Sequence, residues 1–474
     1  MKQFIFLLVS IFTTVGANIE ILNLAKPLVN GTDGVFVKDL HLATFQESKG
    51  IIVKASNITV DLVNGKMVTK STSNGQFPYK ALSCVQVQFV TQVSNGMPTV
   101  DFETNVDNDR NALVIFNDAS QILDIDEDTL NKLAQTGKVL IGAFDRWSLK
   151  LEQKFHNRGF VVIQNLDKPK GIDLTKKYWA YLFFYDAFTQ NVPLLTSAIA
   201  IENNSAFPFC NESMFKSAML SHSYALKDRL WPDYKGNPIS LENGGKLHYL
   251  NHYGTHVDAP LHFYSKGKTL GETFNVVPCV KINCHHITGY SQLIKTAEVE
   301  QWERQTGRKI PKDALVFFET GLDRYWNISQ EQYGKYDASG RPGNPGVAVE
   351  TARWLVDERQ ITGLGIDAFS YDVGNSHNFP VHIALATARI QTIGLENLAN
   401  LNEIPDASGV AGNGRYYDPV GHCLLVYPNI PKGSNGSPVA VFAHFEKRNS
   451  IPSSASFLRP ILFFPVSILI LFYN

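Results

Sequence analysis

Four side chains that can bind a metal or carry a proton lie within one short run of the sequence: His252, His256, Asp258 and His262. The first three are metal-ligand types at spacings of four and two, and the fourth is a further titratable imidazole. All four positions have the same parity, so in an extended segment their side chains would share one face. The spacing therefore predicts that one cation is bound by the first three residues, with a proton carrier beside it.

The two histidines at an interval of four could instead lie on a helix, as they do in zinc proteases. That motif requires Glu directly after the first histidine and no glycine between the pair. Tyr253 and Gly254 occupy those positions, so we expect an extended segment that bends at Gly254 and ends at Pro260. The sequence contains no Gly-x-Ser-x-Gly motif, which leaves a serine hydrolase without support.

The run from 252 to 263 resembles the His-x-Gly-Thr-His-x-Asp-x-Pro-x-His signature of the cyclase family of metal-dependent hydrolases, which includes bacterial kynurenine formamidase and isatin hydrolase. Other segments resemble the family in the same order along the chain. They are 220–222 and 231–232 upstream, and 365–372, 380–382, 393–398 and 433–439 downstream. The resemblance covers about residues 206–446 and implies the family's swivelling β/β/α fold for them.

The resemblance implies a site that holds one or two divalent ions, Zn²⁺ or Mn²⁺. Its ligands would be His252, His256, Asp258, His382 and Glu396, and in two-metal members the two carboxylates bridge the ions. His262 would be the general acid and base. Such an ion activates a water molecule for attack on a carbonyl carbon, and an imidazole takes the water's proton and delivers it to the leaving nitrogen.

This chemistry predicts a metal-dependent hydrolase of small amides or cyclic amides. It would be similar to kynurenine formamidase, an arylformamidase, and would act on C–N bonds other than peptide bonds. The alternative is a non-catalytic extracellular binding protein that keeps the fold and a structural metal. His262 favours catalysis, because a structural metal does not need an additional imidazole.

The segments that must position these residues are typical of a mixed α/β domain. Val- and Ile-rich stretches at 314–318 and 363–366 predict strands, and the apolar spacing within 347–359 predicts a helix. The whole chain has 474 residues, of which 44% are hydrophobic and 18% charged, so it is long enough for two globular domains. A formal net charge of −1 gives no indication of nucleic-acid binding.

Residues 18–205 repeat features of residues 206–446 in the same order. Segments 52–61, 112–116, 141–144 and 199–203 can be laid on 250–258, 314–318, 366–369 and 393–397. This alignment places Asp61 on Asp258 and Glu202 on Glu396. It predicts a degenerate copy of the same fold that has lost its histidines and stands in for the second subunit of the family's homodimers, a pseudo-dimer within one chain. The alternative is chance similarity among apolar strands, with a homodimer of whole chains.

Both ends of the sequence carry targeting signals. Lys2, the apolar stretch 4–15 and small residues up to Ala17 predict a secretory signal peptide over 1–17. Residues 447–474 begin with small and polar residues and finish with the apolar stretch 461–473, which is shorter than a bilayer-spanning helix. We expect a signal for a GPI-type glycolipid anchor, with a short membrane tail or a buried chain end as alternatives. The protein would then be extracellular or anchored at the cell surface.

A secreted protein could be glycosylated and could form disulfides, so two further features of the sequence become relevant. Six Asn-x-Ser/Thr sequons become candidate glycosylation sites: Asn30, Asn57, Asn203, Asn211, Asn327 and Asn435. Five cysteines leave at least one without a partner in the chain, and the pairing is open. The cluster of Cys284, His285 and His286 continues a strand-like segment and lacks a fourth ligand nearby, so we interpret it as structural rather than as a second metal site.

Overall fold

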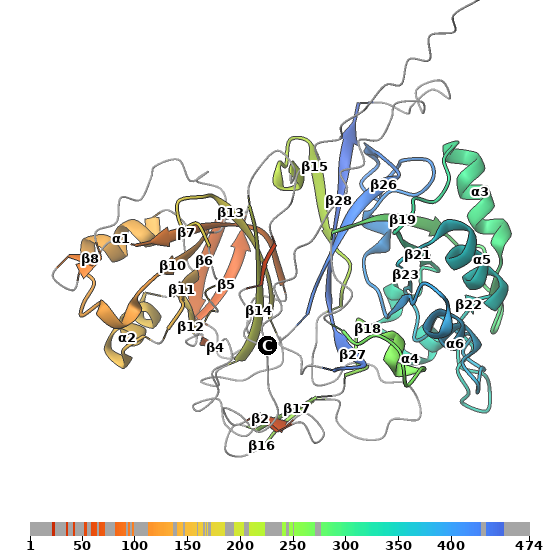
Figure 1. Ribbon diagram of the computed structural model, residues 1–474, viewed down its shortest axis with the longest axis horizontal. Coiled ribbons are helices and arrows are strands. Elements are labelled where there is room, and N and C mark those ends of the chain that lie inside the picture. Colours follow the sequence, from red (N-terminus) through yellow and green to blue (C-terminus); the bar gives the residue numbers. More distant parts are fainter. Residues whose placement is uncertain are drawn as a thin grey trace, which may run out of the picture.

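In the computed structural model the chain forms two halves, each built on its own large β-sheet (Figure 1). The structure describes residues 81–91, 112–135, 140–145, 147–158, 160–164, 172–184, 194–202, 208–222, 251–270, 276–427 and 433–449, the single residues 166 and 168, and the short strands before residue 99 and between 239 and 249. The predicted signal peptide and the apolar tail from residue 450 onward lie outside the described residues. So do the sequon residues Asn30, Asn57 and Asn203.

The first sheet has eight strands, all between residues 21 and 202. In spatial order they are β1 (Ile21–Asn23), β14 (Leu194–Glu202), β13 (Tyr178–Phe184), β7 (Ala81–Val90), β10 (Ala112–Phe116), β11 (Leu140–Ala143), β12 (Val161–Gln164) and β4 (Ile52–Lys54). Two helices, α1 (Glu127–Gln135) and α2 (Leu149–Asn157), follow β10 and β11 along the chain. This half is therefore mixed α/β in its own right.

The second sheet carries the segments that were predicted to hold the site. Its strands, in spatial order, are β15 (Phe215–Met219), β28 (Ala440–Arg448), β26 (Val420–Val426), β19 (Val277–Asn283), β21 (Leu315–Glu319), β23 (Gly363–Ile366), β24 (Ile393–Glu396), β18 (His256–Asp258) and β27 (Gly436–Pro438), with β25 (Tyr416–Tyr417) paired to β28. The predicted strands at 314–318 and 363–366 are confirmed as β21 and β23. A mixed α/β fold is confirmed with them.

Short two-residue to six-residue strands form the remaining pairings. A four-stranded sheet joins β16 (Ile239–Glu242), β17 (Lys246–Tyr249), β3 (His41–Leu42) and β2 (Val35–Phe36), and thus connects segments from both halves. Three two-stranded sheets pair β5 (Ile58–Val63) with β6 (Lys66–Ser71), β8 (Val93–Ser94) with β9 (Met97–Pro98), and β20 (Leu293–Ile294) with β22 (Gly346–Val347).

Helices cover the outer face of the second sheet (Figure 1). They are α3 (Thr296–Thr306), α4 (Gln330–Gly334), α5 (Val349–Arg359) and α6 (Pro380–Thr387). Buried Trp302, Leu355 and Leu385 from these helices join Val316 and Leu364 of the strands in one core cluster. The helix predicted over 347–359 is confirmed as α5, because its apolar residues recur at helical spacing and face this cluster.

The two sheets share one topology. Eight strands follow each other in the same spatial order, β1-β14-β13-β7-β10-β11-β12-β4 in the first sheet and β15-β28-β26-β19-β21-β23-β24-β18 in the second. Four adjacent strands in each sheet are parallel to one another: β7, β10, β11 and β12 in the first sheet, and β19, β21, β23 and β24 in the second. All other pairs of neighbouring strands in these two series are antiparallel. The eight strands also occur in the same order along the chain.

The hydrogen-bond register identifies the residues that correspond. When Leu113 of β10 is laid on Leu315 of β21, as in the alignment of 112–116 with 314–318, the strand pairings place Val161 on Ile393 and therefore Gln164 on Glu396. Gln164 pairs with Ile52 of β4, just as Glu396 pairs with His256 of β18. The first sheet therefore has Ile52 and Gln164 where the second sheet has a histidine and a glutamate.

This register corrects the residue matching expected from the sequence. Asp61 does not correspond to Asp258, because it lies on β5, which pairs with β6 in a separate sheet. The counterpart of Asp258 is Lys54 of β4. Glu202 does not correspond to Glu396, because it lies on β14, the counterpart of β28. Apolar strands of similar composition can be matched in several ways, and only their hydrogen-bonded neighbours distinguish the correct one.

The halves meet through strands that hold equivalent places in the two sheets. β13 and β14 of the first sheet lie against β26 of the second. Tyr181 of β13 also reaches β28, where its hydroxyl is 3.0 Å from Nε2 of His444 and its ring packs edge-on against Phe442. Contact between the same surface of two copies is the arrangement found in dimers with twofold symmetry.

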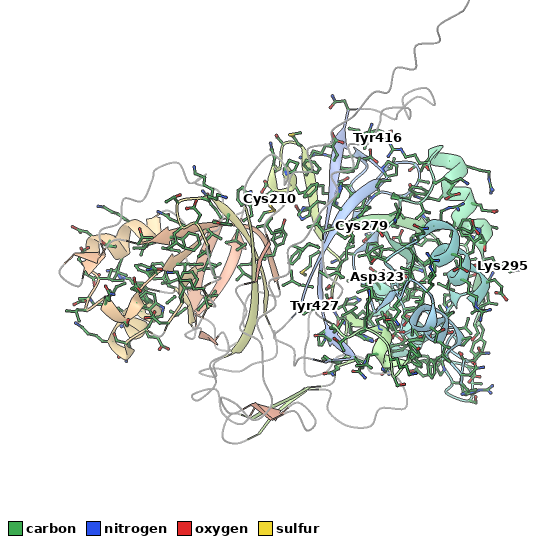
Figure 2. All side chains as sticks on the ribbon, viewed as in Figure 1. Cys210, Cys279, Lys295, Asp323, Tyr416 and Tyr427 are labelled. Carbon is green, nitrogen blue, oxygen red and sulfur yellow. A yellow bond between two sulfur atoms is a disulfide. The ribbon has the colours of Figure 1, made fainter. Side chains whose placement is uncertain are left out.

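Four of the five cysteines form disulfides in the structure. Cys84 of β7 is bonded to Cys210, which lies beside the boundary between the halves in Figure 2. Cys279 of β19 is bonded to Cys423 of the adjacent β26. Cys284 is free and buried. Within the described residues, no helix is long and apolar enough to cross a membrane.

Candidate metal centre

Strand β18 places two of the predicted ligands side by side. His256 and Asp258 are two positions apart, so both point to one face of the strand, and both side chains are buried. β18 is hydrogen-bonded to β24 on one side and to β27 on the other. A strand with neighbours on both sides is held in place, so its side chains are fixed before any ion binds.

The segment before β18 bends as predicted. Gly254 has φ of +58°, a backbone conformation that favours glycine, and the bend brings His252 back towards the strand. The strand ends at Asp258, and the 3-10 helix η3 (Pro260–His262) follows it. The parity of position 262 predicted that His262 continues the face of the strand. This prediction is wrong, because the strand ends before His262. His262 returns to the site through η3 and stacks on His252, with 3.8 Å between the ring centroids.

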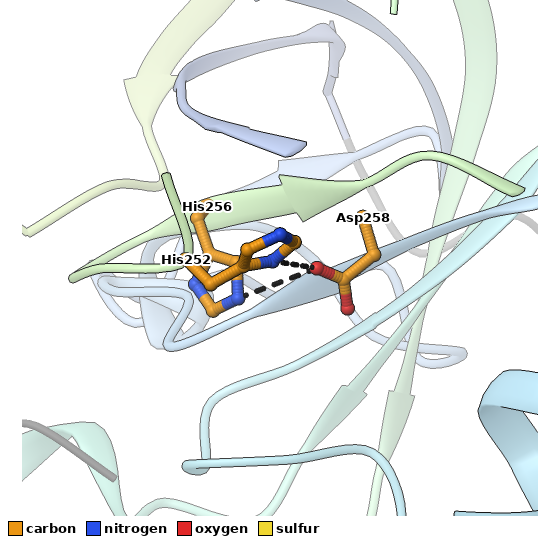
Figure 3. Close-up of side chains that lie close together, drawn as sticks. All are labelled: His252, His256 and Asp258. Carbon is orange, nitrogen blue, oxygen red and sulfur yellow. Dashed lines mark hydrogen bonds and ion pairs between the residues drawn. The ribbon is translucent and has the colours of Figure 1, made fainter. Parts of the chain in front are cut away.

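His252, His256 and Asp258 form one group of possible metal ligands (Figure 3). Nδ1 of His252 is 2.6 Å from Oδ1 of Asp258, and Nε2 of His256 is 3.5 Å from the same oxygen. The donor atoms of the group all lie within 4.8 Å of one another. The predicted three-residue site is therefore assembled in the structure.

Asp258, His382 and Glu396 form a second group that shares Asp258 with the first. Nε2 of His382 is 3.2 Å from Oδ2 of Asp258 and 3.2 Å from Oε1 of Glu396. Nε2 of His256 is 3.4 Å from the other oxygen of Glu396. All five residues that the family resemblance implied as ligands thus come together, although they lie on β18, β24, α6 and the bend before β18.

The donor set fits a divalent transition metal. Imidazole nitrogens and carboxylate oxygens are the ligands of zinc and manganese sites, and two groups that share a carboxylate can hold one ion or two. Asp258 and Glu396 are also both buried within reach of the same imidazoles. Two buried carboxylates require positive charge nearby, which an ion or protonated histidines can provide.

The charges of the centre shift its pKa values in the metal-free protein. Burial lowers the pKa of His256 and of His382, but the hydrogen bonds and charges of the carboxylates outweigh burial and raise both pKa values. Burial raises the pKa of Asp258 and of Glu396, but the surrounding imidazoles outweigh it and hold both pKa values below the ordinary range. His256 and His382 of the metal-free centre are therefore stabilised in their protonated forms, and an ion must displace those protons.

These shifts predict how stability depends on pH. Histidines whose folded pKa is raised stabilise the fold below the unfolded pKa, and that contribution disappears as the pH rises through the folded pKa. We expect the melting temperature of metal-free protein to fall as the pH rises above about 6.5 and through the raised pKa values of His256 and His382, and the stabilisation by added Mn²⁺ to grow over the same range. Thermal unfolding with EDTA and with Mn²⁺ at each pH measures both. A metal-induced stabilisation that shrinks as the pH rises would contradict the prediction.

His262 lies beside the ligands without belonging to either group. Its ring centroid is 6.4 Å from that of His382. Burial lowers the pKa of His262 to about 4, and the neighbouring histidines reinforce the effect while Asp258 opposes it. A neutral imidazole at physiological pH is able to accept a proton. The position and the neutral form both agree with the role that the sequence predicted.

Asp372 holds His382 in place, a role that the sequence did not reveal. Its carboxylate accepts hydrogen bonds from the backbone N–H groups of Val381 and His382 at 2.9 and 3.2 Å, and from Nδ1 of His382 at 2.7 Å. Because Nδ1 donates to Asp372, Nε2 is the nitrogen that faces Asp258 and Glu396, and its lone pair becomes available for an ion once its proton is displaced. The segment 365–372 was matched to the family, but nothing in its local pattern indicates which residue it supports.

Two aromatic rings form a wall beside the centre. Phe263 and Phe379 are half-buried, and their ring centroids lie 4.5 Å and 5.4 Å from that of His382. Phe379 has φ of +46°, a strained conformation for a non-glycine residue that carries a free-energy cost of about 1–3 kcal/mol. Such strain at the edge of a candidate site is a common feature of ligand-binding positions.

The other candidate residues lie apart from the centre. His285 and His286 reach different carboxylates, those of Glu319 and Glu298, while the neighbouring Cys284 is buried, so the structural interpretation of this cluster holds. The sequon residues Asn211 and Asn327 are exposed. Asn435 differs from both, since its side chain contacts His252 and His262.

The chain is similar to known proteins over part of its length. Residues 189–373 match the protein family described as "Putative cyclase". Among solved structures, isatin hydrolase A from Labrenzia aggregata is 26% identical over 48% of this chain and 93% of its own, with a TM-score of 0.40. Isatin hydrolase A from Ralstonia solanacearum is 23% identical over 48% and 92%, also with a TM-score of 0.40. A structure described as a potential metal-dependent hydrolase with cyclase activity is 20% identical over 50% and 100%, with a TM-score of 0.37. No curated protein matches the chain.

Proposed function

We propose that this protein is a metal-dependent hydrolase of small amides or cyclic amides, from the premise that residues 189–373 belong to the cyclase family, as the sequence predicted. One observation carries the proposal: five candidate ligand side chains from distant parts of the chain converge, and an additional imidazole, that of His262, lies beside them without belonging to either group. Kynurenine formamidase-like or isatin hydrolase-like chemistry is the nearest guide to its substrates.

The residues of the centre have separable roles in this proposal. A divalent ion bound by the five ligands supplies Lewis acidity, which lowers the pKa of water and polarises a carbonyl group. His262 takes a proton from the attacking water and returns it to the leaving nitrogen. Phe263 and Phe379 offer apolar surface to a planar substrate. Asp372 keeps His382 oriented.

A non-catalytic binding protein with a structural metal is the competing function. A structural metal needs saturated ligation and no proton carrier. The half-buried imidazole of His262 has no purpose in such a site, and the strained Phe379 beside His382 favours a ligand-binding role. We therefore favour the enzyme.

Activity of the purified chain decides between these functions. The protein is stripped of metal, restored with Zn²⁺ or Mn²⁺, and assayed against N-formylkynurenine, isatin and a panel of formamides and lactams. We expect turnover of at least one substrate that depends on the added ion. A protein that binds no divalent ion, or that binds an ion and turns over no member of the panel, would count against the hydrolase.

We further propose that the first half is a degenerate copy that takes the place of a second subunit. The shared strand order and the contact between equivalent strands support it. The register that puts Ile52, Lys54 and Gln164 at ligand positions supports the loss of metal binding in that copy.

This arrangement predicts both the oligomeric state and the metal content. We expect a monomer in solution, because the surface used for dimerisation is already covered within the chain. We expect no more than two ions per chain, because one copy retains ligands. Native mass spectrometry and elemental analysis measure the two quantities. A stable dimer, or four ions per chain, would overturn the proposal.

We propose that the mature protein is secreted and held at the cell surface. The signal-peptide pattern of 1–17, the small residues and apolar stretch of the C-terminal segment, and two disulfides, which persist in oxidising compartments, support this location. Release from cells by a phosphatidylinositol-specific phospholipase would distinguish a glycolipid anchor from a membrane tail.

A further inference from the structure

Asn435 begins one of the six sequons, yet its side chain lies in the metal centre. Its Oδ1 is 3.4 Å from Nε2 of His252, and its Nδ2 is 3.5 Å from Nδ1 of His262. These are long hydrogen bonds, but one carboxamide spans two imidazoles whose centroids are stacked 3.8 Å apart. An exposed glycan acceptor would not be expected in this position.

The rest of the sequon is packed against the same residues. A Cβ atom on Gly436 would lie 2.2 Å from Cε1 of His252, so the ring of His252 can occupy its place only because residue 436 is glycine. Ser437 is fully buried on β27, which is hydrogen-bonded to β18. The carbonyl oxygen of Asn435 accepts a hydrogen bond of 2.9 Å from the backbone N–H of Ala259. The position of Asn435 is therefore set by the strands of the centre.

The hydrogen bond to Asn435 selects one form of His252. Nδ1 of His252 faces Asp258 at 2.6 Å, so this nitrogen needs a free lone pair if it is to bind an ion. The ring proton must then lie on Nε2, where Oδ1 of Asn435 is the nearby acceptor. Metal-binding histidines generally donate their other N–H to such an acceptor, which fixes both the proton position and the ring orientation.

The same amide acts on the proton carrier. With Oδ1 turned towards His252, Nδ2 is left to donate to Nδ1 of His262. Asn435 thereby occupies Nδ1 of His262 and leaves Nε2 as the nitrogen available for proton transfer. One side chain thereby couples the orientation of a ligand to that of the general acid.

We propose that Asn435 is a positioning residue that orients His252 for metal binding and His262 for proton transfer, and that its sequon carries no glycan in the active protein. A glycan would be attached through Nδ2, the atom that faces His262, and would place a sugar against the centre. The effect on His262 rests on the proposed function. The effect on His252 and the absence of a glycan are independent of the proposed function.

Two variants separate the positioning role from the sequon. Asn435→Ala removes both the carboxamide and the sequon, whereas Ser437→Ala removes the sequon alone and keeps Asn435. We expect Asn435→Ala to weaken Mn²⁺ binding by about 10-fold to 100-fold, as is usual for a residue that supports a ligand. We expect Ser437→Ala to bind Mn²⁺ within about twofold of the parent chain. Asn435→Asp, which keeps the acceptor oxygen, should retain more of the affinity than the alanine variant does.

The readouts are equilibrium Mn²⁺ titration, kcat on a substrate of the parent chain, and the mass of the secreted protein before and after glycosidase treatment. Circular dichroism of each variant checks that it is folded. The inference is supported if Asn435→Ala loses affinity and kcat while Ser437→Ala keeps both, and if the peptide with Asn435 carries no glycan. It is overturned by a glycan on Asn435 in metal-loaded protein, by equal losses in the two variants, or by unchanged Mn²⁺ affinity in folded Asn435→Ala. If the parent chain has no hydrolase activity, the proposed function fails, but the affinity and glycan measurements still decide this inference.

Discussion

Asp258→Asn is expected to abolish metal binding at both ligand groups. The carboxylate of Asp258 belongs to each group, with one oxygen 2.6 Å from Nδ1 of His252 and the other 3.2 Å from Nε2 of His382. Asparagine keeps the size of the side chain but removes its charge and one of the two ligand oxygens. We expect a loss of affinity well beyond the 10-fold to 100-fold typical of supporting residues, and a loss of activity of roughly 1000-fold or more, since Lewis acidity contributes several kcal/mol to the barrier.

Asp418→Asn is the matched control for this prediction. Asp418 is also a buried carboxylate, but it is paired with Arg308 and Arg448, outside the metal centre. The control should lower the melting temperature, because a buried charge pair loses one partner, and leave the metal content unchanged. Elemental analysis and calorimetric titration of both variants provide the comparison. If Asp258→Asn still binds an ion with the affinity of the parent chain, the two groups do not share Asp258 as a ligand.

His262→Ala is expected to lower kcat by about 100-fold to 10,000-fold while the metal content stays the same. His262 is in neither ligand group, so its removal takes away the proton carrier alone. Its neutral form, which burial favours by lowering the pKa to about 4, is the form that accepts a proton from water. Added imidazole should restore part of the lost rate, because it can enter the space that the side chain leaves.

His286→Ala is the control for His262→Ala. His286 is an exposed histidine near Glu298, remote from the ligand groups, and its removal should leave kcat unchanged. Steady-state kinetics and elemental analysis on both variants complete the test. Loss of the ion from His262→Ala would show that His262 is a ligand, and the assignment of its role would then be wrong.

The local part of the site could be predicted from the sequence, and the structure explains why. His252, His256 and Asp258 are close in the chain, so their convergence depends only on a short strand and a bend at Gly254. His382 lies on α6, which makes its approach to Asp258 a matter of tertiary packing. Only the resemblance to a family indicated that residue, because no local pattern encodes a contact between distant elements.

Three features could not be predicted from the chain alone. The supporting role of Asp372 depends on the start of α6, where backbone N–H groups and an imidazole meet its carboxylate. The contact of Asn435 with His252 depends on β27 pairing with β18. The register of the first sheet depends on which strands are neighbours, so Asp61 was matched to Asp258 although Lys54 holds that place. The packing of α6 decides the first case and strand pairing decides the other two, and similarity between sequence segments reveals neither.

The covalent connection between the two similar halves has a consequence for where such a protein can work. A homodimer that needs its partner to complete or shelter a site loses that help when the protein is diluted. Two halves in one chain meet at an effective concentration that dilution does not change, and the disulfide between Cys84 and Cys210 adds a second covalent link between β7 and the start of the second half. Under the proposed duplication, each chain therefore stays complete by itself at any dilution.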